Sequence, residues 1–216
     1  MASQTDICND ALTLLGAGTI NAITDQSNQA YALNAVWNLE RQSELRKHIW
    51  KFAIARYQCP LLATAPVNGP YTQAFSLPPD NLRILQIGDT NYDYPGVDLS
   101  DYRAGPTLDD YVVEGNTILS NLSSPVSLRY IRDRTDPTQW DASFAAAFAA
   151  RLADRTCFRI TQSHDGEKVA AARYKQDIMD AIRANALETP PTQAADDSWV
   201  ATRPVGSGGA AWIRYG

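Results

Sequence analysis

Reactive and metal-binding side chains are scarce in this chain. Its 216 residues include only three cysteines and two histidines. The cysteines, Cys8, Cys59 and Cys157, are odd in number, lie far apart and form no Cys-x-x-Cys pair. This pattern favours neither a disulfide framework nor a zinc site. We expect buried thiols in a reducing compartment, with no metal and no cofactor.

The chain also lacks a long apolar run, an export signal and an excess of positive charge. Its longest apolar run, residues 144–150, is far too short to span a bilayer. The first ten residues contain none of the regions of a signal peptide. The net charge of −5 argues against a general nucleic-acid binder. We therefore expect a soluble protein made in a cytoplasm.

Two apparent ligand-binding motifs fail on inspection. Gly16 and Gly18 follow a helical pattern, and a third glycine is missing, so a helix C-cap is favoured over a phosphate loop. The run that begins at Asp89 resembles the opening of a calcium-binding EF-hand loop. However, Tyr94 stands where that loop needs glycine, and Ser100 where it needs glutamate. We set both motifs aside.

Catalytic patterns are absent as well. The sequence has no Gly-x-Ser-x-Gly elbow, no Walker loop and no dinucleotide fingerprint. His48 is the one candidate base, but no acid or nucleophile is evident beside it, and we interpret it as a residue at the end of a helix. From these absences we expect a protein without enzymatic activity.

The strongest structural signal is a helix over residues 136–163. Asp136 and Pro137 predict its start. One large apolar face is formed by residues that recur every four positions: Trp140, Phe144, Phe148 and Leu152. The alanines between them would let other helices approach closely. We expect this helix to be packed on more than one side.

Three further helices are predicted. Thr5 can cap a short first helix, and Ser27 a second that ends near Trp50. The second helix has a broad apolar arc that includes Tyr31, Ala35 and Leu39, and we expect it to be covered on two sides. A fourth helix, residues 167–187, follows a short turn and should form an antiparallel hairpin with residues 136–163.

The middle of the chain has β-strand patterns. Short apolar runs between prolines and glycines predict strands at residues 75–77, 82–87, 111–113, 117–119 and 126–131. Residues 89–114 hold seven acidic residues and one base, and we expect a long exposed loop there. Its aromatics Tyr92, Tyr94 and Tyr102 are candidates for a contact with a partner or a neighbouring subunit.

The C-terminal residues 192–216 combine glycine-rich spacing with large aromatic side chains. A purely solvating tail would not usually carry such residues, so we expect an arm that docks elsewhere. Its candidate anchors are Trp199, Trp212, Ile213 and Tyr215.

Arg151, Arg155 and Arg159 lie at i, i+4 and i+8 on the predicted helix and form a positive stripe. The stripe has three interpretations. It could be a solvated face with local pairing to Asp154, or a nucleic-acid contact, which the net charge opposes. It could also pair with an acidic surface such as residues 89–114 of a neighbouring subunit in a ring.

These patterns predict an α+β protein. The expected fold is an α-helical bundle of about four helices, including a long C-terminal helical hairpin, with an inserted antiparallel β domain and an extended C-terminal tail. Residues 1–50 and 137–187 would form the bundle, residues 51–136 the β-rich insertion, and residues 188–216 the arm.

Three phrases carry a family resemblance: LRKHIWKFAIAR, FSLPPDNLRILQI and YIRDRTDPTQWDASFAAAFAARLADRTCFRITQS. They resemble the head-to-tail adaptor proteins of short-tailed bacteriophages, the tail tubular protein A family, over roughly residues 7–187. The resemblance implies a structural virion protein without enzymatic activity. It would be assembled in the host cytoplasm and located at the head–tail junction.

The resemblance also implies partners. Such adaptors form a ring, expected to be a dodecamer, between the portal protein and the tail nozzle protein. DNA passes through the central channel during genome ejection, without sequence-specific binding. The C-terminal anchors would then bind the portal, and the three tyrosines the nozzle or a neighbour. The alternative is a monomeric binding or enzymatic domain with a pocket between its helical and β parts.

Overall fold

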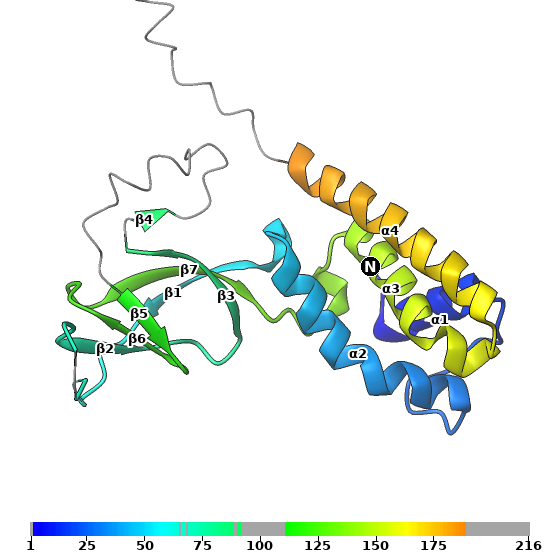
Figure 1. Ribbon diagram of the computed structural model, residues 1–216, viewed down its shortest axis with the longest axis horizontal. Coiled ribbons are helices and arrows are strands. Elements are labelled where there is room, and N and C mark those ends of the chain that lie inside the picture. Colours follow the sequence, from blue (N-terminus) through cyan, green and yellow to red (C-terminus); the bar gives the residue numbers. More distant parts are fainter. Residues whose placement is uncertain (1, 65, 68, 89, 92–110, 189–216) are drawn as a thin grey trace, which may run out of the picture.

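The computed structural model describes residues 2–64, 66–67, 69–88, 90–91 and 111–188. The fold is mixed α+β, as predicted. Within the described residues the helices lie at one side of the molecule and the strands at the other (Figure 1). The α-helices of the described ranges are α1 (Gln4–Leu14), α2 (Asn28–Lys47), α3 (Ala142–Thr161) and α4 (His164–Leu187).

The N-cap of the first helix lies two residues before the predicted cap. Ser3, and not Thr5, is the N-cap: its hydroxyl accepts from the Asp6 amide, and the Asp6 carboxylate accepts from the Ser3 amide. This reciprocal capping box satisfies two amides at once, which a cap at Thr5 could not do. The helix ends as predicted, with Gly16 in the left-handed region at φ 67°.

The predicted long helix is split near its start. Asp136 caps only a short 3₁₀ turn, η3 (Pro137–Gln139), and Trp140 then adopts an extended conformation. Asp141 provides a second cap by accepting from the amides of Ser143 and Phe144 at 2.9 and 3.2 Å. The break allows the Trp140 indole N–H to donate to the Arg134 carbonyl at 2.9 Å. Helix α3 therefore begins at Ala142.

Helix α2 buries only one of its two apolar faces. Leu33, Trp37 and Leu45 lie in the core, whereas Tyr31 is 56% exposed and Leu39 66% exposed. Ala35, midway between these two, is exposed as well. The apolar pattern predicted a helix that is covered on two sides, and within the described residues the face with Tyr31, Ala35 and Leu39 is not covered. Periodicity identified the face but not its environment.

The strands form two antiparallel sheets in the described part of the chain. One has the order β1 (Ile54–Cys59), β7 (Val126–Arg132), β3 (Asn81–Ile87) and β4 (Thr90–Asn91). The other has the order β2 (Gln73–Ser76), β6 (Thr117–Ser120) and β5 (Tyr111–Glu114). All five predicted strands are confirmed, and Gly115 makes the hairpin turn between β5 and β6 with φ 60°. Strands β1 and β4 were not predicted.

Two apolar clusters hold the fold together. The larger one joins the helices and contains the predicted residues Trp140, Phe144, Phe148 and Leu152, all buried. Ile178 and Ile182 of α4 pack against it while partly buried. The smaller cluster lies between the two sheets and includes Phe75, Ile118 and Leu128. The C-terminal part of α2 contacts β3 and β7.

Candidate functional site

Most of the predicted site residues lie outside the described part of the chain. This applies to the portal-arm residues Trp199, Trp212, Ile213 and Tyr215, and to Tyr92, Tyr94 and Tyr102. Their roles stay predictions. Of the predicted sites, the structure places the arginine stripe of α3.

The structure turns two members of that stripe toward helix α2. The Arg151 Nε donates to Glu40 Oε2 at 2.9 Å, and the Arg155 Nε donates to Glu40 Oε1 at 2.7 Å. Arg151 also donates to Asp154 at 2.8 Å, which is the local pair that the sequence predicted. One glutamate on α2 thus accepts from two arginines one turn apart on α3. Arg159 is exposed, and no described residue forms an ion pair with it.

A second glutamate extends the contact to helix α4. Glu44 lies 3.4 Å from Arg151 and accepts from the Tyr174 hydroxyl at 2.8 Å. The Arg151 guanidinium lies over the Tyr174 ring, 5.0 Å from its centroid. Burial, together with the hydrogen bond to Glu44, raises the pKa of Tyr174. We call Glu40, Glu44, Arg151, Arg155 and Tyr174 the glutamate network.

The glutamate network is built to hold three helices in register. Glu40 is 4% exposed and Glu44 1% exposed, so both carboxylates need compensating donors. Lys47 of α2 itself donates to Glu44, and the other donors come from α3 and α4, more than 100 residues away along the chain. Because the arginines already donate hydrogen bonds to the carboxylates, we interpret the network as a structural contact between helices and not as an acid–base pair.

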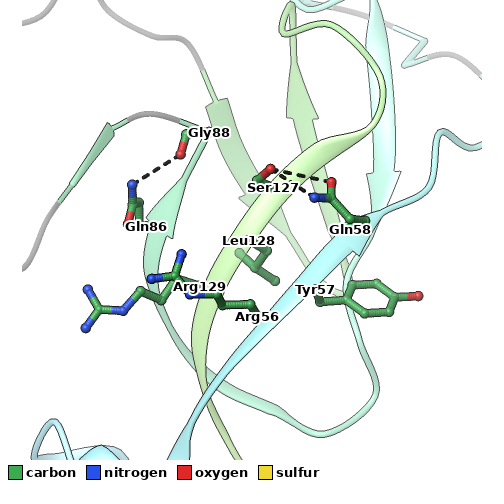
Figure 2. A pocket seen from close by; sticks show the side chains of 8 residues that line it. All are labelled: Arg56, Tyr57, Gln58, Gln86, Gly88, Ser127, Leu128 and Arg129. Atoms are coloured by element: carbon green, nitrogen blue, oxygen red, sulfur yellow. Dashed lines mark hydrogen bonds between the residues drawn. The ribbon is translucent and has the colours of Figure 1, made fainter.

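A different pair of arginines lies on the four-stranded sheet, one on β1 and one on β7 (Figure 2). Arg56 of β1 and Arg129 of β7 are directly opposite in the antiparallel register, and Gln58 is opposite Ser127. Together with Gln86 these side chains border a hollow of about 190 Å³. We call this group the sheet hollow. The figure shows Arg56, Arg129 and Gln86 extending to the same side of the sheet.

The local backbone explains why Gln86 joins this face. The pairing of β3 with β7 slips between Ile84 and Gln86, so that Gln86, and not Leu85, lies opposite Arg129. Such a bulge redirects side chains at the end of a strand. The Gln86 amide then donates to the Gly88 carbonyl at 3.3 Å, and Gly88 has φ 58°. The other end of the same sheet face, including Leu85 and Ile131, belongs to the helical cluster.

A third feature is an apolar groove among the helices. It has a volume of about 450 Å³ and is lined by the end of α1, the middle of α3 and the start of α4, including Leu14, Ala153, Cys157 and Val169. Its lining is largely apolar, with Arg173 at its border, where it pairs with Asp177. Nothing in its chemistry points to a reaction.

The remaining candidate residues are held in structural positions. His48 ends α2 and lies edge-on to Trp50, and burial lowers its pKa. The three cysteines are free and buried, as predicted. Burial raises the pKa of the Cys8 thiol to about 12 and that of Cys59 to about 11, so neither has the character of a reactive thiolate.

Two further kinds of feature are absent from the described residues. No group of three or more histidine, cysteine, aspartate or glutamate side chains in that part of the chain could hold a metal ion. None of the helices described there combines the length and apolar character needed to cross a membrane.

Comparison with known proteins adds no identity. No protein-family model matches the chain, and no curated protein matches it either.

The sequence contained signals for both arginine groups that a local interpretation missed. Glu40 and Glu44 are spaced i, i+4, as are Arg151 and Arg155, so complementary stripes existed on two predicted helices. In β1, Arg56 and Gln58 alternate with Tyr57 and Cys59, which is a strand pattern with one polar face. Neither signal says which elements meet in space.

Proposed function

We propose that this chain is a structural assembly protein: a head-to-tail adaptor that forms a ring between a portal and a tail nozzle. One observation carries the proposal. Helix α2 has a second apolar stripe, Tyr31, Ala35 and Leu39, on a face that no part of the described chain covers. Exposed apolar stripes of this kind are typical of surfaces that bind another protein. A second copy of the chain is the occupant that a ring requires.

The arrangement of elements supports the proposal. The helices from the two ends of the chain pack together, and the strands come from the segment between them. We interpret this as a helical bundle with an inserted β domain, over residues 1–50, 137–187 and 51–136. The resemblance in sequence to phage head–tail adaptors spans both parts. The glutamate network would keep the bundle rigid while its outer faces bind neighbours.

The test of this proposal is the oligomeric state, alone and with a portal. We expect electron micrographs of the purified protein mixed with portal to show a ring with cyclic symmetry. Leu39→Arg should abolish the ring, because it places a charge in the centre of the apolar stripe. Leu187→Arg, at an exposed leucine on the end of α4, is the matched control and should assemble normally. A protein that stays monomeric under all these conditions would support the alternative, a monomeric binding or enzymatic domain.

The portal and nozzle contacts call for separate truncations. Removing all residues after 191 should leave the melting temperature unchanged and prevent attachment to portal-bearing heads. Deleting residues 91–105 should leave the helical part folded and prevent attachment of the tail. Infectious particles from either deletion would contradict the corresponding assignment.

A further inference from the structure

Two apolar surfaces of the helices are left open within the described residues. One is the exposed stripe Tyr31, Ala35 and Leu39, which we call the α2 stripe. The other is the groove of about 450 Å³ between the end of α1, the middle of α3 and the start of α4, which we call the helical groove. At its border Val169 is 70% exposed and Leu14 43% exposed, so apolar side chains line its opening.

The two surfaces point in nearly opposite directions. Helix α3 lies between α2 and α4 (Figure 1) and faces α2 with Phe148, which packs edge-on against Trp37, and with Arg151, which donates to Glu40. The residues of α3 that line the helical groove are three or four positions apart: Ala150, Ala153, Cys157 and Thr161. At 3.6 residues per turn, they point roughly 150° away from Phe148 and Arg151. The α2 stripe also faces away from α3, because Trp37 and Glu40 lie on the opposite side of α2.

The two surfaces match in charge. Every exposed side chain in residues 28–42 is uncharged, which leaves the outer face of α2 neutral over four turns. The charged residues of this stretch, Glu40 and Arg41, are buried and paired inside the chain. The one charged residue that lines the helical groove is Arg173, which pairs with Asp177 at 2.9 Å. A contact between the two surfaces would therefore bury apolar atoms without desolvating an unpaired charge.

The two surfaces also match in length. Along α2 the distance from Tyr31 to Leu39 is about 12 Å, and along α3 that from Ala150 to Thr161 is about 16 Å, at 1.5 Å per residue. The small side chains of Ala150 and Ala153 in the lining would let the backbone of a second helix approach closely.

We propose that the helical groove binds the α2 stripe of a second copy of this chain. This inference rests on the proposed ring and names the surface that the stripe meets. Because the two surfaces point in opposite directions, each bound pair leaves one free stripe and one free groove, and further copies add in the same way until the ring closes. A contact of stripe with stripe would instead stop at a dimer and leave the groove open.

The first test is a substitution at the border of the helical groove. Val169→Arg should keep the melting temperature, because the side chain is exposed, and prevent rings under the conditions in which the wild type forms them. The matched control is Met179→Arg, at a residue of the same helix that is 52% exposed and does not line the groove. Normal rings from Val169→Arg overturn the inference. If those rings no longer attach to the portal or the tail, the groove belongs to that partner.

The second test is cross-linking of the free, full-length protein at high concentration. Leu39→Cys protein, labelled with nitrogen-15, is mixed with unlabelled Val169→Cys protein and a short bis-maleimide reagent, and the products are weighed by mass spectrometry. The native cysteines are buried, so the reagent reaches the introduced ones. We expect about ten times more mixed dimer than from Leu39→Cys with Met179→Cys, because a bound pair raises the effective concentration of the two thiols.

The outcomes separate this inference from the adaptor role. Rings without mixed cross-links above the control overturn the inference and leave the ring. Mixed cross-links without rings, even with portal present, support the contact and contradict the adaptor role. Cross-linking of Leu39→Cys mainly with itself overturns the inference in favour of a two-fold dimer, and the absence of both rings and cross-links overturns both proposals.

Discussion

The two arginine groups of this protein are held in opposite ways. Arg151 and Arg155 of α3 close onto glutamates of α2 that are almost completely buried. Arg56 and Arg129 lie beside each other on a sheet face, and Arg56 is exposed without an ion pair among the described residues. The first group is a completed structural contact. The second is a pair of like charges at the surface of a sheet.

The comparison shows that a charged stripe in a sequence does not reveal its partner. The stripe on α3 was a candidate for contact with a neighbouring subunit, yet two of its three members are occupied inside the chain. The pair on the sheet was not predicted, because strand β1 was not. The two groups differ in burial. The carboxylates that face the α3 arginines are buried and require charged partners, whereas an exposed arginine on the sheet does not.

The largest effect should follow the loss of a buried glutamate. Glu44→Ala leaves Arg151 with fewer acceptors and the Tyr174 hydroxyl without one, so we expect a loss of about 3–5 kcal/mol in the free energy of unfolding. Urea titration measures it. Glu114→Ala, at an exposed position on β5, is the control and should change the free energy by less than about 0.5 kcal/mol. Equal effects of the two substitutions would contradict the comparison.

Another arginine, Arg41, tests the junction between the helices and the four-stranded sheet. Arg41 of α2 donates to both carboxylate oxygens of Asp133, just after β7, at 2.8 Å each. Burial alone would raise the pKa of Asp133, but the hydrogen bonds from Arg41 and Gln42 and the charge of Arg41 hold it below its usual value. Asp133→Asn should therefore cost about 1.5–3 kcal/mol at pH 7.

The pH dependence of this variant has a definite sign. A carboxyl group with a lowered pKa in the folded state stabilises the protein above its unfolded pKa of about 3.9, and its contribution is lost as pH falls through the folded pKa. The difference between wild type and Asp133→Asn should thus shrink as pH falls below about 4. Urea titrations at pH 7 and pH 3 measure it; a constant difference would show that the ion pair is not its source.

A smaller effect should isolate one hydrogen bond of the glutamate network. Tyr174→Phe removes the hydroxyl that donates to Glu44 but keeps the ring under Arg151. We expect a loss of about 1 kcal/mol in the free energy of unfolding. Tyr57→Phe, at a tyrosine of β1 that is 40% exposed, should have no measurable effect and serves as the control.

The smallest effect on stability should come from Arg159. It is exposed, so Arg159→Gln should change the free energy of unfolding by less than about 0.5 kcal/mol. If Arg159 contacts a neighbouring subunit, the same variant should form rings only at higher protein concentration, as measured by sedimentation. Unchanged assembly would leave the stripe without an intersubunit role.

The sequence by itself determined most of the local structure. Apolar spacing of four placed Trp140, Phe144 and Phe148 in one core, and the alternation of apolar and polar residues identified β7. Caps, glycines and prolines set most ends, because they act through the backbone of their own neighbours. The errors at local ends, Thr5 for Ser3 and Asp136 for Asp141, arose where two good caps lay within five residues of each other.

Only the tertiary structure decided what each surface meets. Periodicity shows that Tyr31, Ala35 and Leu39 share a face of α2, but the covering of that face depends on helices folded from distant residues. The same holds for Glu40, whose arginine partners lie 111 and 115 positions away. The bulge that brings Gln86 beside Arg129 likewise depends on pairing with a strand about 40 residues later. Contacts between distant residues follow from packing the whole chain, and no local pattern encodes them.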